Sequence, residues 1–499
     1  MQEIEIKLAA TPEGLATLLE DPGLGGPAEE HRFTTTYYDT VDWRLRRAGM
    51  ALRVRSDGDS REQTLKRSLG DGAGPITRAE WSAPLTDEFP VLHAFPAEAR
   101  HAVAPLLGRR RLWAYAQLVT DRTIRTALFR DSLIELAFDR VRIGSGDAVV
   151  LHHELELELL QGSRADLLHF ALELPFACGL SWSITAKSER ACRLAGGKAA
   201  GAAKAGPVAL ERTMDVTQAF RAIAWNCLTQ FLRNYPLIIE TRDSEALHQG
   251  RVALRRLRAA FAIFSDLLTG SLAERLRQEI AAATKILGTG RDLDVLIAGL
   301  AGVPGTDHPD PEAASELIAE LARQRERAYA HIIEMLRSAP FQRLLFETAL
   351  WIEELAETEA PILPFVARTL RKRRQRIVDR LERLRTLTPR QRHRLRIAVK
   401  KLRYAAEFVE GLYPGEDRKR FADTLGQLQD RLGDLNDLAD ARSRALIDFP
   451  ELGDTDRARL SRTLDHLVQA RADQEDTLLD AAVAAGKDVL AVPRFWKKD

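Results

Sequence analysis

Three charged side chains alternate with isoleucine in the first seven residues of this 499-residue chain, Met-Gln-Glu-Ile-Glu-Ile-Lys. Successive side chains of a β-strand point to opposite faces, so Glu3, Glu5 and Lys7 share one face and Ile4 and Ile6 the other. Carboxylate oxygens in this arrangement suit a hard cation such as Mg²⁺. An edge strand with solvated charges would show the same pattern, and these residues alone do not separate the two interpretations.

The same alternation recurs along the chain up to about residue 193. Most of these short strands carry either carboxylates or Arg and Lys on one face, whereas a solvated face usually mixes Thr, Ser, Gln and Lys. The basic positions are Arg53, Arg55, Lys66, Arg78, Arg125 and Lys187, and the acidic positions are Glu80, Glu135, Asp139, Glu154, Glu156 and Glu158. A closed or nearly closed antiparallel barrel would turn these faces inward.

Clustered like charges inside such a barrel need counter-charges. A divalent cation would neutralise the carboxylates, and a phosphate chain would neutralise the Arg and Lys side chains. A metal beside a phosphate chain indicates phosphoryl or nucleotidyl transfer chemistry.

The motifs follow one another in a recognisable order. They are Glu3-x-Glu5-x-Lys7, Tyr37-Tyr-Asp-Thr40, Leu52-Arg-x-Arg55, Leu65-Lys66, Arg78-x-Glu80, Arg125, Glu154-x-Glu-x-Glu158 and Lys187-Ser-Glu-Arg190. Together they resemble the CYTH family, the triphosphate tunnel metalloenzymes, over residues 1–195. The resemblance implies an eight-stranded antiparallel β tunnel with flanking helices that binds a triphosphate and one or two divalent cations. One departure is Trp81-Ser82, where relatives often have another acid.

The resemblance also implies roles for individual residues. The expected metal ligands are Glu3, Glu5, Glu154 and Glu156, with Mg²⁺ as cofactor and Mn²⁺ as the alternative. The expected phosphate ligands are Lys7, Arg53, Arg55, Lys66, Arg78, Arg125 and Lys187. Lys7 and Tyr37 would act on the attacking water, and a Lys among cations would have the lowered pKa that a general base needs. Lys7 as a phosphate ligand only is the alternative, and Glu135 and Asp139 are either partners of the Arg cluster or structural salt bridges.

The chain divides into a β-rich part and a helical part. Small residues from Ala195 to Pro207 indicate a linker, and from about Met214 to Val489 the periodicity is helical. We therefore predict a multidomain α+β protein with domains at 1–195 and 213–490 joined by a flexible linker at 196–212.

Composition adds few constraints. The net charge of +1 favours no class of partner, and three Cys form no metal-ligand spacing and no disulfide framework. No signal peptide and no apolar run long enough for a membrane span are visible, so we expect a cytoplasmic protein without membrane partners. The sequence does not predict the oligomeric state.

The helical part contains a repeat at an offset of 145 residues. The segment 248–258 matches 393–403, and 287–293 matches 432–438 at the same offset, which indicates a duplicated helical unit. Residues at i, i+3, i+7 and i+10 form one stripe along a helix. The stripe is His248, Arg251, Arg255 and Arg258 in the first copy and His393, Arg396, Lys400 and Arg403 in the second.

Two such stripes would line one groove or pore and attract an extended polyanion, helped by the basic run Arg371–Arg376. Nucleic acid is disfavoured because no aromatic residues interleave with the charges. The alternative is an Arg-rich helix face whose charges pair with Glu on adjacent helices. A metal site built on His248 and His393 is less favoured. Asp292 and Asp437 are expected to support the fold or hold the stripe.

This half resembles the CHAD domain, the conserved-histidine α-helical domain, over about residues 213–490. The resemblance implies two pseudo-symmetric four-helix bundles and binding of inorganic polyphosphate. The two resemblances together imply a metal-dependent inorganic triphosphatase, which forms pyrophosphate and phosphate, tethered to a polyphosphate-binding domain. Association with polyphosphate granules is a further expectation. The alternatives are a granule-binding protein with a non-catalytic sensor tunnel, and a hydrolase or cyclase of an organic triphosphate such as thiamine triphosphate or ATP.

Overall fold

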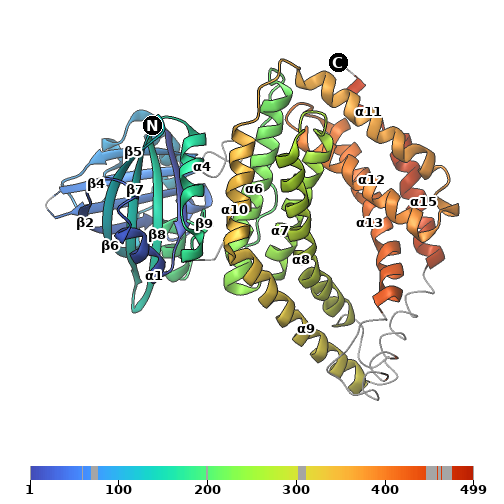
Figure 1. Cartoon of the computed structure of the whole chain (residues 1–499), viewed down its shortest axis with the longest axis horizontal. Coiled ribbons are helices and arrows are strands. Elements are labelled where there is room, and N and C mark those ends of the chain that lie inside the picture. The colour runs from blue at the N-terminus through green and yellow to red at the C-terminus, as the bar shows by residue number, and fades with distance from the viewer. Residues whose placement is uncertain are drawn as a thin grey trace. The chain divides into compact units, whose positions relative to one another are not determined.

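Alternating strands and short helices make up the first part of the chain in the computed structural model (Figure 1). The structure describes residues 2–58, 60–68, 77–197, 201–301, 311–444, 458, 462 and 475–497. The strands are β1 (Gln2–Ala9), β2 (Glu29–Asp39), β3 (Met50–Asp57), β4 (Ser60–Ser68), β5 (Thr77–Pro84), β6 (Trp113–Phe129), β7 (Ser132–Ser145), β8 (Ala148–Gln161) and β9 (Ser181–Ser183). The helices among them are α1 (Pro12–Glu20), α2 (Arg44–Arg47), α3 (Ala97–Leu107), α4 (Arg164–Glu173) and α5 (Lys187–Leu194).

The strands form one antiparallel sheet in the order β5-β4-β3-β2-β6-β7-β8-β1-β9. Residues 2–4 of β1 also pair with residues 77–79 of β5, the strand at the other end of this order. Eight strands are predicted from the sequence, whereas the described residues form nine. The additional strand, β9, has only three residues and pairs with residues 7–9 of β1.

The outward faces of β2 to β5 pack on a small apolar core. Leu52, Leu65 and Trp81 from the sheet meet Phe95 and Val103, the latter on α3. Because neighbouring residues of a strand face opposite ways, this core turns the charged side chains of β3 and β4 to the other face of the sheet. The charged side chains of these strands thus share the face opposite the apolar core, as the alternation in the sequence predicts.

The later part of the chain is helical in its described residues. The helices are α6 (Val216–Thr241), α7 (Ser244–Ile263), α8 (Ser271–Ala301), α9 (Pro311–Arg337), α10 (Ala339–Glu353), α11 (Ile362–Leu381), α12 (Pro389–Phe408), α13 (Glu416–Arg444) and α15 (Glu475–Ala491). Helices α7 and α12 begin and end 145 positions apart, and α8 and α13 begin 145 positions apart. The repeat predicted from the sequence thus appears in the helix boundaries. None of the described helices is long and apolar enough to cross a membrane.

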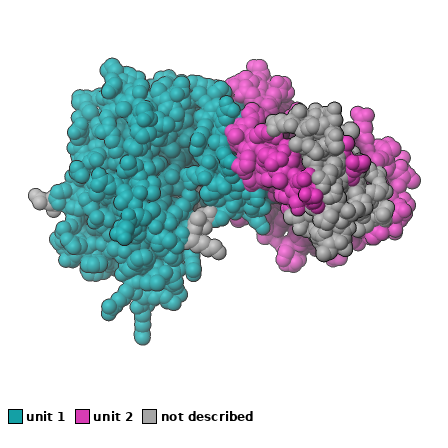
Figure 2. Space-filling model, turned by 90° about the horizontal axis from the view of Figure 1, so that it is seen from below, with its two compact units in different colours: residues 1–205, 225–250, 333–355 teal, residues 206–224, 251–332, 356–499 magenta. Residues whose placement is uncertain are grey.

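Two compact units make up the structure (Figure 2), and they do not follow the order of the chain. Unit 1 contains residues 1–205, 225–250 and 333–355, and unit 2 contains residues 206–224, 251–332 and 356–499. Within unit 1, the side chain of Asn234 on α6 bonds both backbone groups of Ala203, at 2.9 and 2.8 Å. These bonds fix one point of the predicted linker.

Candidate active site and basic stripe

A cavity of about 1220 Å³ lies in unit 1 on the charged face of the sheet. The predicted site residues on its wall are Glu3, Lys7, Tyr37, Arg53, Arg55, Lys66, Glu156 and Lys187. Glu80, Glu135 and Glu158 line it as well. Side chains from seven strands and α5 therefore converge on one space.

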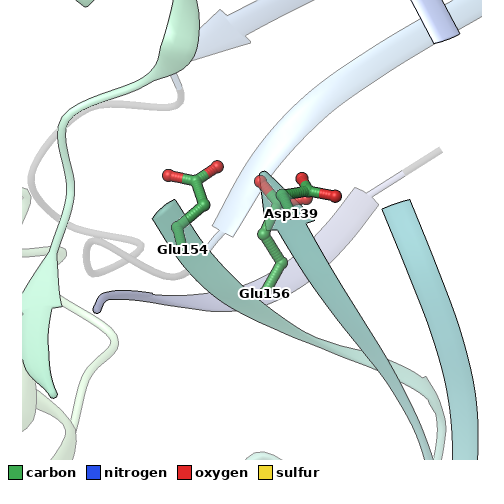
Figure 3. A group of neighbouring side chains, drawn as sticks. All are labelled: Asp139, Glu154 and Glu156. Atoms are coloured by element: carbon green, nitrogen blue, oxygen red, sulfur yellow. The ribbon is translucent and has the colours of Figure 1, made fainter. Parts of the chain in front are cut away.

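Two buried carboxylates and one half-buried carboxylate form a compact acidic group among the described residues. Asp139 on β7 and Glu154 and Glu156 on β8 bring oxygen atoms within 4.8 Å of one another, and their side chains rise from neighbouring strands (Figure 3). The geometry has the oxygen donors that a divalent cation requires. Its charge, however, is already matched by cationic side chains.

Three cations contact this acidic group. Lys187 lies 2.7 Å from Asp139 and 3.0 Å from Glu156, and it also contacts Glu154. The guanidinium of Arg122 donates two hydrogen bonds to Asp139, at 2.7 and 2.6 Å, and one to Glu156 at 2.5 Å. Lys7 contacts Glu156 as well. Three carboxylates therefore face three cations, and the group is close to neutral.

The pKa values in this group follow from that pairing. Burial alone would raise the pKa of Glu154, but Lys187 and the bond to His152 hold it at about 2. Burial likewise opposes charge on Glu156, yet Lys187, Lys7 and Arg122 hold its pKa well below the usual range. Both carboxylates are thus ionised at neutral pH.

Lys7 differs from the sequence prediction of a lowered pKa. Burial would lower the pKa of its ammonium, but Glu156 and Glu5, the latter 2.7 Å away, raise it above the ordinary value. A lysine with a raised pKa carries its proton at neutral pH and does not accept one from water. In this geometry Lys7 is a hydrogen-bond donor and a positive charge.

A second acidic group runs straight across three strands. Glu135 pairs with Glu158, and Glu158 pairs with Glu5, so three carboxylates lie side by side on β7, β8 and β1. Like charges directly opposite each other destabilise a sheet. Burial and then Glu135 and Glu5 raise the pKa of Glu158. Burial and then Glu5 raise the pKa of Glu3 to about 7.

Lys7 lies 2.7 Å from Glu5 in this acidic row, and a second cation, Lys66, is shared among the acids beside the row. The ammonium of Lys66 lies 3.0 and 2.9 Å from the two Glu3 oxygens and 2.7 Å from Glu80. Burial is the first cause of the raised pKa values of Glu3 and Glu158, and neighbouring carboxylates add to it while Lys66 opposes it. The carboxylates of this row are further candidates for holding a divalent cation, beside the group of Asp139, Glu154 and Glu156.

The basic side of the cavity brings guanidinium groups together. Burial, followed by Arg53 and Arg122, lowers the pKa of Arg55 to about 10. Its guanidinium lies 4.8 Å from the centre of the Phe33 ring, and Arg53 reaches Glu80 only at 3.8 Å. Adjacent guanidinium groups with few counter-charges suit the oxygen atoms of a phosphate chain.

Tyr37 occupies the same side of the cavity. It pairs with Arg53 across β2 and β3, is nearly buried, and stacks on Tyr115 with ring centres 6.0 Å apart. Asp39, two residues later, accepts bonds from the backbone of Thr40, Leu45 and Arg46 at 2.6 to 3.0 Å. The carboxylate of Asp39 is thus used to hold the turn into α2, whereas the side chain of Tyr37 lines the cavity.

The structure corrects the placement of Arg125. Its guanidinium donates to the carbonyl oxygens of Asp21 at 2.7 Å and Leu19 at 2.6 Å, next to the end of α1. Arg122, three residues earlier, faces the cavity in its place. Residues an odd number apart lie on opposite faces of a strand, so only one of these two Arg can point inward. The acidic face of β7, with Asp139 opposite Arg122, was the signal that could have identified it.

Other residues of the cavity mouth were not predicted. Arg46 makes a bidentate ion pair with Glu189, with hydrogen bonds of 3.1 and 2.8 Å. Gly201, Ala203 and Arg233, the last on α6, also line the cavity. The side chain of Arg78, on β5, lies outside the described residues, as does that of Asp437 on α13.

The basic stripe gathers charge from both repeats within unit 2. Burial first, then Arg255, Arg396 and Arg251, lowers the pKa of Lys400 to about 7. Burial lowers the pKa of Arg251 despite Asp292, whose carboxylate lies 3.8 Å from it, and Arg255 and Arg396 lower it further. Side chains of α7 and α12 therefore share one positive field.

Two glycines place the stripe arginines in equivalent ways. A Cβ atom added at Gly288 on α8 would lie 3.3 Å from the guanidinium of Arg251, and one at Gly433 on α13 would lie 3.4 Å from that of Arg396. These residues are 145 positions apart in each case. Arg258 and Arg403 continue the stripe on α7 and α12. His393 is exposed on α12, and His248 lies half-buried on the stretch of α7 that belongs to unit 1.

Comparison with known sequences agrees with the division of the chain into a β-rich part and a helical part. The sequence model of the CYTH domain matches residues 1–184, and that of the CHAD domain matches residues 222–446. The chain contains a CYTH domain followed by a CHAD domain. The predicted resemblance to the two families is confirmed.

Two relatives illustrate the likeness. A protein of Haemophilus influenzae named inorganic triphosphatase is 29% identical over 211 residues, which cover 38% of this chain and 54% of that protein. The chain thus matches about half the length of this curated relative. The crystal structure of the CHAD domain from the plant Ricinus communis is 28% identical with a TM-score of 0.52, and the match covers 59% of this chain and 99% of that one.

Proposed function

We propose that the CYTH domain hydrolyses inorganic triphosphate to pyrophosphate and phosphate with Mg²⁺, and that the CHAD domain binds inorganic polyphosphate. The observation that carries the proposal is one cavity whose lining brings carboxylates such as Glu3 and Glu158 together with Arg53, Arg55 and Arg122. The name of the Haemophilus influenzae relative supports the choice of substrate.

The architecture that we propose keeps the predicted domains at 1–195 and 213–490 with the linker at 196–212. In the first, β1 to β8 would form the triphosphate tunnel, and the short pairing of β1 with β5 supports a closed ring. In the second, the two repeats form pseudo-symmetric four-helix bundles.

Arg53, Arg55 and Arg122 would bind the phosphate oxygens. Guanidinium groups bind phosphate oxygens in pairs and with fixed geometry, so they would hold the chain in one register. Lys66 would bind a phosphate oxygen close to the acidic row, because it already lies beside Glu3 and Glu80. Arg125 is left out of this set, since it bonds the backbone near α1.

Glu3, Glu5 and Glu158 would hold the divalent cation. When bound, such a cation stabilises negative charge that develops on phosphate oxygens. Glu154 and Glu156 were also predicted as ligands, but here they are neutralised by Lys187, Lys7 and Arg122. Their proposed part is to fix those cations in place.

Lys7 and Tyr37 would position the attacking water. The raised pKa of Lys7 keeps its ammonium charged, so it would orient the water or a phosphate oxygen by donating a hydrogen bond. Phosphoryl transfer depends mainly on positioning and charge stabilisation, and a weak base suffices.

The deciding experiment measures phosphate release from inorganic triphosphate, ATP and thiamine triphosphate with Mg²⁺, for the full chain and for Glu5→Gln. We expect release from inorganic triphosphate only, and a loss of roughly a hundredfold or more in the variant, which is typical when a group that stabilises transition-state charge is removed. Glu30→Gln, an exposed residue of the same type on β2, is the matched control.

Other outcomes point elsewhere. Release from ATP or thiamine triphosphate alone would indicate an enzyme for organic triphosphates. No release from any substrate would contradict the proposed hydrolysis and favour a polyphosphate-binding protein with a sensor tunnel.

A further inference from the structure

The polar face of α11 carries an unusual concentration of positive charge. Six cations line a groove of about 560 Å³ between α11 and α12: Arg373, Arg376, Arg380, Arg383, Arg394 and Lys401. Asp379 is the one carboxylate among the described residues of this lining, and Ile397, 42% exposed, is its largest apolar side chain. The groove lies wholly within unit 2.

This groove is distinct from the basic stripe. The stripe occupies positions 393, 396, 400 and 403 of α12, whereas the groove uses positions 394, 397, 398 and 401. One turn of helix takes 3.6 residues, so the two sets follow neighbouring faces of the same helix. Burial, then Arg373 and then Arg258 lower the pKa of Lys401. Arg258 of the stripe therefore lies close enough to the groove for its charge to act there.

The equivalent face in the first copy of the repeat, on α6, carries no charge. At positions 145 residues earlier than Arg373, Arg376, Arg380 and Arg383, helix α6 has Leu228, Phe231, Tyr235 and Ile238. All four are at most 3% exposed. In the first copy this face is part of an apolar core, whereas in the second it is a row of arginines.

Solubility alone does not require such a row. An exposed helix face is normally satisfied by polar residues and by charges of both signs. Here the cations repel one another: burial and then Arg376 lower the pKa of Arg373, and the described residues include no ion pair for any of the six. A bound polyanion would remove this repulsion.

The chemistry of the lining favours a phosphate chain. Arg373, Arg376 and Arg380 follow one another along α11 over about 10 Å at 1.5 Å per residue, and Arg383 lies two residues beyond the end of the helix. Forked guanidinium groups suit phosphate oxygens. The lining contains no aromatic residue on which a base could stack, which disfavours single-stranded nucleic acid.

We infer that the groove between α11 and α12 is a second binding site for inorganic polyphosphate, separate from the basic stripe. The inference rests on the proposed polyphosphate binding by the CHAD domain. A long chain would occupy both faces of α12, and each site would contribute its own phosphate contacts.

The test uses the full chain, long-chain polyphosphate and a chelator that removes divalent metal and thereby stops the proposed hydrolysis. The groove variant is Arg376→Gln with Arg380→Gln, and a second variant, Arg383→Gln with Arg394→Gln, repeats the test at other residues. The matched control is Arg275→Gln with Arg277→Gln on α8, which removes the same charge from residues paired with Glu279 and Glu274. Arg255→Ala with Lys400→Ala disables the stripe.

Each groove variant should bind polyphosphate about tenfold more weakly, because losing a charge-assisted bond costs about 1.4 kcal/mol or more. The slope of log affinity against log salt should fall by roughly 1 to 2, since two phosphate contacts are lost. The control should match the wild type in both, and the groove and stripe losses should add in a combined variant. Triphosphatase activity with Mg²⁺ should be unchanged by the groove substitutions.

Two results would overturn the inference. One is a pair of folded groove variants that match the control in affinity and in salt slope. The other is a groove variant that loses affinity for a single-stranded oligonucleotide but keeps it for polyphosphate, which would make the groove a nucleic-acid surface. Unchanged binding by the stripe variant would instead contradict the proposed role of the stripe, and the groove result would be read independently.

Discussion

Two glutamates on one strand illustrate how neighbours decide the chemistry of a side chain. Glu156 and Glu158 both face the cavity from β8. Glu156 pairs across the sheet with Lys7, whereas Glu158 pairs with Glu5 and with Glu135. The pKa of the first is held far below its usual range and that of the second is raised. Of the two, only Glu158 lies directly opposite carboxylates on both neighbouring strands.

Glu158→Gln should therefore weaken metal binding. Removing one oxygen ligand from the acidic row should raise the Mg²⁺ concentration needed for half-maximal activity by about tenfold to a hundredfold, a range typical of groups that support a metal. The measurement is the Mg²⁺ dependence of phosphate release, with Glu30→Gln as the control. An unchanged Mg²⁺ requirement would remove Glu158 from the proposed ligands.

Arg55 and Arg125 should respond differently to the same substitution. Arg55→Gln should raise the KM for triphosphate by about tenfold, because a charge-assisted bond to the substrate is lost. Arg125→Gln should leave KM unchanged and lower the free energy of unfolding by about 1 kcal/mol, since it loses bonds to backbone carbonyls. Equal effects of the two variants on KM would contradict the placement of Arg125 outside the cavity.

Much of this site follows from alternation along strands, and its errors have physical causes. Runs such as 153–159 fix which residues face inward, and the structure places Glu156 and Glu158 as predicted. Asp139 on the acidic face of β7 was the sign in favour of Arg122 over Arg125, and using it required the register of β6 against β7. The pKa of Lys7 was mispredicted because the sequence shows nearby cations but not the carboxylates that contact it.

At the level of elements, the glycines of α8 and α13 explain how the stripe is held. Gly288 and Gly433 leave room for the heads of Arg251 and Arg396 against the neighbouring helix. Glycine costs helix stability, about 0.5 to 1 kcal/mol relative to alanine, so its presence at both equivalent positions favours a packing role.

Gly433→Leu should displace the Arg396 head and weaken polyphosphate binding by about tenfold, as expected for the loss of one charge-assisted contact. Gly426→Leu on the same helix is the control, because a Cβ there meets nothing within 4 Å. Binding in metal-free buffer is the measurement. Equal affinities of the two variants would show that Arg396 does not contribute.

The stripe should also take up protons when it binds. Lys400 faces Arg251 and Arg255 from α7 and Arg396 and Arg403 from α12, and with burial these lower its pKa to about 7. Above that pH the free protein holds a neutral Lys400, and a bound polyanion would raise its pKa again. At about pH 8 binding should take up about one proton.

Calorimetry in two buffers with different ionisation enthalpies measures this uptake, and Lys400→Met should abolish it. The same shift has a consequence for stability. The unfolded chain binds the proton of Lys400 up to its ordinary pKa, so this residue destabilises the free protein below about pH 7 and the cost disappears as the pH rises toward 10.5. Proton uptake that persists in Lys400→Met would assign it to another group.

Helix period and repeat offset were sufficient to predict the helical elements, since long periodic segments carry a strong signal. Strand β9 was missed because three residues cannot show alternation. Its position is instead fixed by packing, with Trp182 stacked on Phe346 at 4.2 Å.

For the whole molecule, the most informative contact is made by Gln342 on α10. This side chain is fully buried in unit 1 and bonds the backbone N–H of Trp182 at 2.8 Å, the hydroxyl of Tyr235 at 3.1 Å and the carbonyl of Leu336 at 2.7 Å. It thereby joins the sheet to helices that belong to the CHAD half of the sequence.

Gln342→Leu should lower the free energy of unfolding of unit 1 by about 1 to 3 kcal/mol, because buried polar groups lose their partners. Gln278→Leu, an exposed residue on α8, should change it by less than about 0.5 kcal/mol. Near-UV circular dichroism during denaturation is the measurement. Equal stability of the two variants would show that this connection is not needed.

The composition of unit 1 also bears on how the protein is made. Strands β1 to β9 leave the ribosome well before α10, yet Trp182 finds its stacking partner Phe346 only after residue 346 has been synthesised. Domains generally fold from the N-terminus as they emerge. During translation the nascent sheet would therefore carry an uncovered apolar patch around Trp182 until α10 arrives, and this interval is when chaperone binding would protect the chain.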